Sequence, residues 1–262
     1  MTDSSLNKNN NHKSNLKKVC RSVTAAAFWL LLWQSAAIFL NNELLLPDVV
    51  QTMRSLLHLS QKAEFWGSCL LSMLRVISGF AAGCLTAIVL AVLASYSKII
   101  CTLISPALKT IRAVPVASFI ILAMVWINSN ALPAFIAFLM VLPMVWSATL
   151  ASIRQTDKKL LEMAKVFRFS KGDIFLKIYI PSCKDSVISA ALSALGFAWK
   201  SAIAAEVISR PVLSLGKNLY DSKVYLETAD AFAVTFTIVV LSMGLEHLIH
   251  KLINLKGGAA ID

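Results

Sequence analysis

The chain is poor in charged residues. Aspartate, glutamate, lysine and arginine make up 15% of its 262 residues, whereas soluble globular domains carry about 25%. Hydrophobic residues make up 57%, and the mean hydropathy is +0.70. This balance excludes an ordinary soluble domain and indicates an integral membrane protein.

Residue patterns that carry enzyme chemistry are missing as well. The five cysteines are scattered and form no CxxC pair, so neither a disulfide framework nor a zinc site is expected. The phosphate-binding pattern GxxxxGK(S/T) is absent, and so are HExxH and GxSxG. We therefore expect no P-loop ATP site, no metal and no catalytic residues. Energy for any transport has to come from another chain or from an ion gradient.

Positive charge is concentrated between the apolar stretches. The formal net charge of +11 would suggest a nucleic-acid partner in a soluble protein. Clustering of the charge in short segments between apolar blocks is instead typical of the cytoplasmic loops of membrane proteins. We expect the lipid bilayer, and no nucleic acid, as a partner.

Six apolar stretches predict membrane-spanning helices. They lie at 22–40, about 74–95, about 107–127, 131–150, about 185–208 and about 231–250. The predicted fold class is all-α, with a transmembrane domain at 22–250 between a flexible tail at 1–21 and a C-terminal tail at 251–262. A signal peptide is the alternative for the first stretch, but its length and the lack of a cleavage site favour an uncleaved helix.

The distribution of lysine and arginine predicts the topology. Eighteen of these 25 residues lie in the two tails and in the segments 96–112 and 151–184, whereas five lie in the segments expected on the opposite side. The excess places both termini and the segment 151–184 in the cytoplasm. An even number of spans agrees with that assignment.

Small residues recur every fourth position in the second span, where they would let another helix approach closely. They are Gly79, Gly83, Ala87, Ala91 and Ser95. Arg75, near the start of this span, is expected to anchor it in the membrane interface. Pro115 is expected to interrupt the third span.

The segment 151–184 is basic and amphipathic. Apolar residues at helical spacing predict a short helix in its first half. Ser170 and Asp173 form a capping pair for a second short helix, and Pro181 ends that helix or begins the next span. The predicted order is helix, turn, helix and transmembrane helix. Helices this short need a surface on which to dock.

The same segment resembles the cytoplasmic EAA signature of ABC importer permeases, which reads E-A-A, three residues, Gly, nine residues and I-x-L-P. The matching residues are Glu162, Ala164, Ile178 and Pro181, at unchanged spacing. The departures are Met163 for alanine, Arg168 for glycine and Ile180 for leucine. The stretches SMLRVISG (72–79), IRAVP (111–115) and AAEV (204–207) are similar to the nitrate, sulfonate and taurine branch of this family. The likeness covers about 45–250.

The resemblance implies that the segment about 158–180 is a coupling helix seated in a groove of an ATP-binding subunit. The residues expected to carry the coupling are Glu162, Ala164, Arg168, Ser170 and Gly172. Glu162 would pair with basic groups of that subunit, and Ala164 would permit its close approach. Arg168 puts the family's tight turn in doubt, because glycine adopts positive φ at much lower cost, and Gly172 could supply flexibility instead. The alternative is a basic helix lying on anionic lipid.

The resemblance also implies the partners: a second permease copy, two ATP-binding subunits and an extracytoplasmic solute-binding protein, at a prokaryotic cell membrane. ATP and magnesium would belong to the ATP-binding subunits, with no cofactor in this chain. The loop 209–230 is a candidate surface for the binding protein. An ordinary solvated loop is the alternative.

The fifth span has two unusual faces. One is a stripe of alanines, which suits close helix contact. The other consists of Ser189, Ser193, Gly196 and Lys200. We expect this second face to line the translocation path, with Lys200 offering positive charge to an anionic solute. Alternatively, Lys200 pairs with a carboxylate or reaches out to the interface. Glu206 is expected to take part in helix packing or gating, as are Gly79 and Gly83.

Two functions fit a multi-pass protein of this kind. The first is the permease of an ATP-driven importer. The second is a self-powered secondary transporter or channel, which predicts inverted repeats and membrane-buried carboxylates. No clear internal repeat is found, and only Glu206 and Glu246 are candidate intramembrane acids. The importer is therefore favoured.

Overall fold

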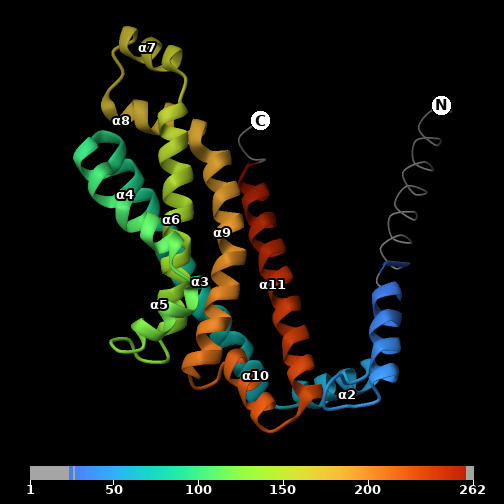
Figure 1. The fold of residues 1–262 in the computed structure, drawn as a ribbon. Helices are drawn as coiled ribbons and strands as arrows, with labels where there is room; N and C mark the ends of the chain where they lie inside the picture. Colours follow the sequence, from blue (N-terminus) through green and yellow to red (C-terminus); the bar gives the residue numbers. More distant parts are fainter. Residues whose placement is uncertain (1–23, 26, 258–262) are drawn as a thin grey trace, which may run out of the picture. The chain divides into compact units, whose positions relative to one another are not determined.

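The protein is described by a computed structural model that covers residues 24, 25 and 27–257 (Figure 1). The tail predicted at 1–21 and the end of the tail predicted at 251–262 lie outside the described residues. The described chain forms two compact units. One contains the residues up to Gln61 together with Ser222–Ala233, and the other contains Lys62–Asp221 together with the residues from Val234 onward.

The first unit holds an apolar helix, Ala27–Leu40, and α2 (Val49–Ser60). Asp48 caps α2 through a capping box, in which its carboxylate accepts the Gln51 backbone N–H at 2.6 Å and its own N–H donates to the Gln51 side chain. The Trp33 indole donates to the Pro47 carbonyl at 3.1 Å. These bonds fix the turn that joins the two helices.

The second unit is built from long helices joined by short turns. In chain order they are α3 (Ala63–Tyr96), α4 (Lys98–Ala113), α5 (Val116–Ala123), α6 (Leu132–Gln155), α7 (Lys158–Val166), α8 (Lys171–Ile174), the π-helical turn η1 (Phe175–Tyr179) and α9 (Ile180–Ser209). Two further helices, α10 (Leu215–Val224) and α11 (Thr228–Gly257), have residues in both units. The described residues thus form an all-helical protein, as the composition and periodicity predict.

The core of the second unit lies where α6 packs along both α3 and α9. The small residues of α3 face α6: a Cβ atom added to Gly79 would lie 2.8 Å from Cβ of Ala137. The alanine stripe of α9 is also buried from Ala194 to Ala202. Close backbone approach leaves no room for larger side chains on these faces.

Four of the described helices are long and apolar enough to cross a membrane: Ala63–Tyr96, Leu132–Gln155, Gly172–Ser209 and Thr228–Lys251. The predicted third span is not one helix. It is the pair α4 and α5, bent by 104° around Pro115, and counting it gives five spans. Proline cannot donate to the helix before it and disfavours helical backbone at the preceding residue, so the chain turns there. The predicted first span is represented by the shorter helix Ala27–Leu40.

The second half of the basic segment differs from the prediction of a separate short helix. After a turn at 167–170, α8 runs through η1 into α9, and Gly172–Ser209 is one continuous helix. Pro181 stands in the first turn of α9 and does not break it. The Ile180 N–H bonds to the Phe175 carbonyl, five residues back, which marks the widened turn. This wide turn accommodates the proline, which has no N–H to offer.

Candidate functional site

A buried ion pair joins α3 to the last turn of α9. Nη1 of Arg75 lies 3.2 Å from Oε1 of Glu206, and their side chains are 12% and 1% exposed. The other carboxylate oxygen of Glu206 accepts the Ser72 hydroxyl at 2.8 Å and the Gly216 N–H at 3.1 Å. Both oxygens of the acid are therefore bonded, which a buried charge requires.

The same arginine holds the loop that follows α9. Its guanidinium donates to the Val212 carbonyl at 3.0 Å and to the Leu213 carbonyl at 3.1 Å. The Leu215 N–H in turn donates to the Ser72 hydroxyl at 3.0 Å. Two residues of α3, one turn apart, thus fix the chain from the end of α9 to the start of α10.

Gly216 is required by this packing. A Cβ atom at this position would lie 2.6 Å from the Val207 backbone nitrogen and would also overlap Glu206. Arg210, just before the loop, ends α9 in the left-handed conformation with φ 48°, and its guanidinium lies 4.8 Å from the centre of the Tyr220 ring. Contacts of Arg210 and Gly216 therefore fix both ends of the loop between α9 and α10.

Arg75, expected to anchor the span in the membrane interface, has a protein partner that this expectation did not include. The helix begins at Ala63, so Arg75 lies well inside it, on the face toward α9, and pairs with Glu206. Sequence reasoning also missed Ser72 and Gly216. The available signal was the spacing of Ser72 and Arg75, which places both on one helix face.

Three of the four residues of the polar face predicted on α9 are exposed within this chain. Ser189, Ser193 and Lys200 are exposed, and Gly196 is half-buried beside Glu246 of α11, with a Cβ atom there 3.3 Å from the carboxylate. Among the described residues, no ion pair is found for Lys200, and Glu206 is engaged by Arg75 instead. Ser189, Ser193 and Lys200 are thus accessible to a solute, a partner or lipid.

The coupling segment presents its predicted residues in different ways. Glu162 is exposed on α7, whereas Ala164 is completely buried. The Ser170 hydroxyl accepts the Asp173 N–H at 3.1 Å and donates to the Asp173 carboxylate at 2.6 Å, which confirms the predicted cap. Gly172 is exposed in the first turn that follows.

Arg168 keeps the turn that a glycine would make. Its φ is 52°, in the left-handed region. The Phe169 N–H bonds to the Ala164 carbonyl at 2.9 Å, and the Arg168 N–H bonds to the Lys165 carbonyl at 3.1 Å. These two bonds form a Schellman motif, in which the left-handed residue after the helix is usually glycine. Arg168 therefore occupies the glycine conformation at some cost in backbone strain.

Figure 1 shows α7 beyond the ends of α6 and α9, within the same unit, and α8 leads from it into the continuous helix that contains α9. The segment is therefore a projection carried by two core helices. No group of three or more histidine, cysteine or acidic side chains able to hold a metal occurs in the part of the chain that the structure covers.

Comparison with known proteins gives a consistent result. Residues 79–250 match the family described as "binding-protein-dependent transport system inner membrane component". A probable ABC transporter permease protein of Brucella melitensis is 26% identical over 222 residues, which cover 84% of this chain and 87% of that protein. These matches extend well beyond the coupling segment.

Two relatives carry names that include a solute. A protein of Bacillus subtilis, provisionally named an aliphatic sulfonates transport permease, is 26% identical over 74% of this chain and 71% of its own length. The bicarbonate transport system permease protein of Synechococcus elongatus is 24% identical over 62% of this chain and 58% of its own length.

Proposed function

Because this chain belongs to the family of binding-protein-dependent transport system inner membrane components, we propose that it moves a small anionic or polar solute by alternating access. It is the multi-pass inner membrane permease of an ABC transporter and not the ATPase. In the proposed cycle, a binding protein delivers the solute, and ATP binding by two separate subunits changes which side of the permease is open.

The coupling segment is the observation that carries this proposal. It projects from α6 and α9, it exposes Glu162, and its turn is held by the Schellman bonds around Arg168. An exposed acid on a basic, rigidly held projection suits docking into a groove lined by basic groups. ATP and magnesium would be held by the partner subunit.

The continuous helix from Gly172 to Ser209 gives the segment a direct mechanical connection. A displacement of α8 would be transmitted along α9 to Lys200 and to the Arg75–Glu206 pair near its far end. Rigid-body motion of packed helices is a common way to convert docking into a change of access.

We infer a six-span arrangement with both termini in the cytoplasm. It consists of the four long apolar helices, the bent pair α4 and α5, and a helix that includes Ala27–Leu40. The bias of lysine and arginine toward the side of the coupling segment supports this orientation. The loop 209–230, which carries the Arg210–Tyr220 contact, would then face the binding protein.

An anionic solute is favoured by Lys200 and by the names of two relatives. Lys200 is exposed on α9, about two turns from Ser193 and about three turns from Ser189 on the same helix face. Sulfonates and bicarbonate, named for those relatives, are both small oxyanions. A second copy of the permease, facing this surface, would complete a path between two such faces.

The test is co-purification of the permease with its ATP-binding subunits. Glu162→Lys should reduce the retained ATPase about tenfold, because a charge reversal at a docked acid places like charges together. Glu64→Lys is the matched control, since Glu64 is also an exposed acid and lies outside the segment, in the first turn of α3. Equal retention in both variants, together with solute transport by the permease alone in liposomes, would favour a self-powered transporter instead.

A further inference from the structure

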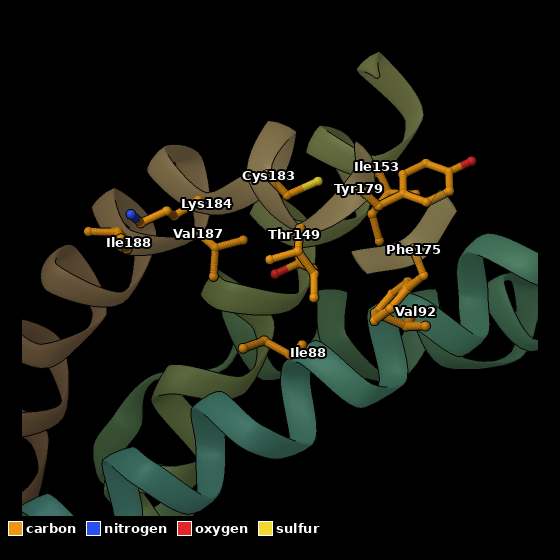
Figure 2. Close-up of a pocket in the computed structure, with 11 residues that line it drawn as sticks. Ile88, Val92, Thr149, Ile153, Phe175, Tyr179, Cys183, Lys184, Val187 and Ile188 are labelled. Carbon is orange, nitrogen blue, oxygen red and sulfur yellow. The ribbon is translucent and has the colours of Figure 1, made fainter. Parts of the chain in front are cut away.

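An apolar cavity of about 230 Å³ lies between three core helices, next to the coupling segment. Figure 2 shows its lining side chains, which come from α3, α6, η1 and α9. The lining includes Ile88 and Val92 of α3, Phe175 of η1 and Val187 of α9. The cavity therefore lies where the coupling segment continues into the membrane helices.

The lining offers almost nothing to a polar ligand. The Thr149 hydroxyl is already bonded to the Val145 carbonyl at 2.8 Å, and the remaining wall is mostly aliphatic and aromatic. Water needs at least two polar partners to occupy a cavity favourably, and this wall does not supply them. An occupant of matching chemistry is a hydrocarbon.

One charged group borders the cavity. Lys184 is exposed on α9, and in Figure 2 its amine lies along the helix toward Ile188, away from Phe175. Among the described residues no carboxylate is paired with it. An apolar space with a free cation at its edge is complementary to a molecule with a hydrocarbon chain and an anionic head.

We propose that this cavity takes an acyl chain of an anionic phospholipid, whose phosphate binds Lys184. The orientation rests on the proposed topology, which places this end of α9 at the cytoplasmic leaflet, where anionic lipids and basic protein groups meet. The lipid bilayer would also be the apolar solvent at the exposed faces of this helix unit, so the occupant needs no separate supply. Exposed Ile180 and Lys184 on α9 form the entry side.

A chain seated there would contact both the coupling segment and the membrane core. Phe175 and Tyr179 belong to η1, the widened turn that joins α8 to α9. An occupied cavity holds η1 against α3 and α6, whereas an empty one leaves space into which η1 can move. Membrane composition would thereby influence the connection between the coupling segment and α9.

The experiment measures phospholipid retained by the full-length permease, purified from membranes with its bound subunits. The protein is exchanged into phosphatidylglycerol or into phosphatidylcholine with identical acyl chains, and bound lipid is counted by native mass spectrometry. We expect about fivefold greater retention of phosphatidylglycerol, the factor that one lysine near an anionic headgroup contributes.

Three variants locate the site. Lys184→Gln should remove the preference for phosphatidylglycerol, and Val187→Phe should fill the cavity and remove retention of both lipids. Lys98→Gln, which removes an exposed lysine on α4 that does not line the cavity, should behave as the unmodified protein. Lys184→Gln keeps the cavity wall intact, so it decides the question even where Val187→Phe fails to fold.

The proposal is overturned by equal retention of the two lipids, or by a preference that survives Lys184→Gln. It is also overturned if Val187→Phe reduces co-purification of the ATP-binding subunits while the amount of bound lipid is unchanged. The cavity would then be occupied by a protein segment and not by lipid. The measurement requires neither ATP nor solute, so its failure is distinct from failure of the transport proposal.

Discussion

The Arg75 guanidinium and the Glu206 carboxylate, 131 positions apart in sequence, lie 3.2 Å apart in the buried contact between α3 and α9. Two backbone carbonyls, a serine hydroxyl and a glycine N–H complete their bonding. The ion pair therefore closes the end of the helix unit opposite the coupling segment, and its removal is expected to loosen that end first.

Glu206→Ala should lower the free energy of unfolding by about 3–5 kcal/mol, because it leaves Arg75 buried without a counter-charge. Thermal unfolding of the purified protein in detergent measures the loss. Glu64→Ala, which removes an exposed acid from the first turn of α3, should cost far less. Replacing Arg75 and Glu206 together by methionine should restore part of the stability, and no restoration would mean that the pair is not the cause.

Gly79→Ala should destabilise the contact between α3 and α6. The added methyl group would lie 2.8 Å from Ala137 Cβ and 2.9 Å from the Ala134 carbonyl carbon, so the helices must separate. The expected cost is about 1–3 kcal/mol, measured by thermal unfolding. Gly244→Ala is the matched control, because no atom lies within 4 Å of a Cβ there. A similar loss in both variants would mean that the contact between α3 and α6 is not the cause, since helix propensity alone favours alanine over glycine.

Arg168→Gly should stabilise the coupling segment. A non-glycine residue at φ 52° carries about 1–2 kcal/mol of strain that glycine does not. Hydrogen exchange of the Phe169 amide, which closes the Schellman turn, should slow in the variant. If retention of the ATP-binding subunits falls although the turn is more stable, the Arg168 side chain itself makes a contact with them.

Lys200→Ala should reduce solute uptake about tenfold without loss of the assembled complex, since a charged hydrogen-bond donor to an anion contributes on this scale. Uptake into vesicles that contain the whole transporter is the measurement, and Lys200→Arg should retain most activity. Lys62→Ala removes another exposed lysine and should have no effect. Unchanged uptake kinetics in Lys200→Ala would assign Lys200 to packing or to the membrane interface.

The features that sequence predicted correctly depend on neighbours along the chain. The cap is formed by Ser170 and Asp173, which are three positions apart. The bend between α4 and α5 lies at Pro115 itself. Composition and periodicity were also sufficient to predict that the chain is an all-helical membrane protein. Local rules act over one or two helical turns, and within that range the residue types determine the outcome.

Features that depend on distant parts of the chain could not be predicted in the same way. Nothing near Arg75 indicates that its partner is Glu206, since the pairing follows from how α3 and α9 pack. The left-handed backbone of Arg168 contradicts the residue's own preference and is imposed by the bonds to Ala164 and Lys165. In the basic segment, apolar spacing indicated helix but could not show that α8 is continuous with α9.

At Arg168 this chain forms the Schellman turn without the glycine that the EAA signature has at this position. A pattern that demands glycine at this position would reject this chain, although the two backbone bonds that define the turn are both present. The turn requires a positive φ at this position, and glycine adopts that angle at the lowest energetic cost. A search for this signature should therefore accept, at the glycine position, any residue whose backbone can be left-handed. Asparagine is one such residue.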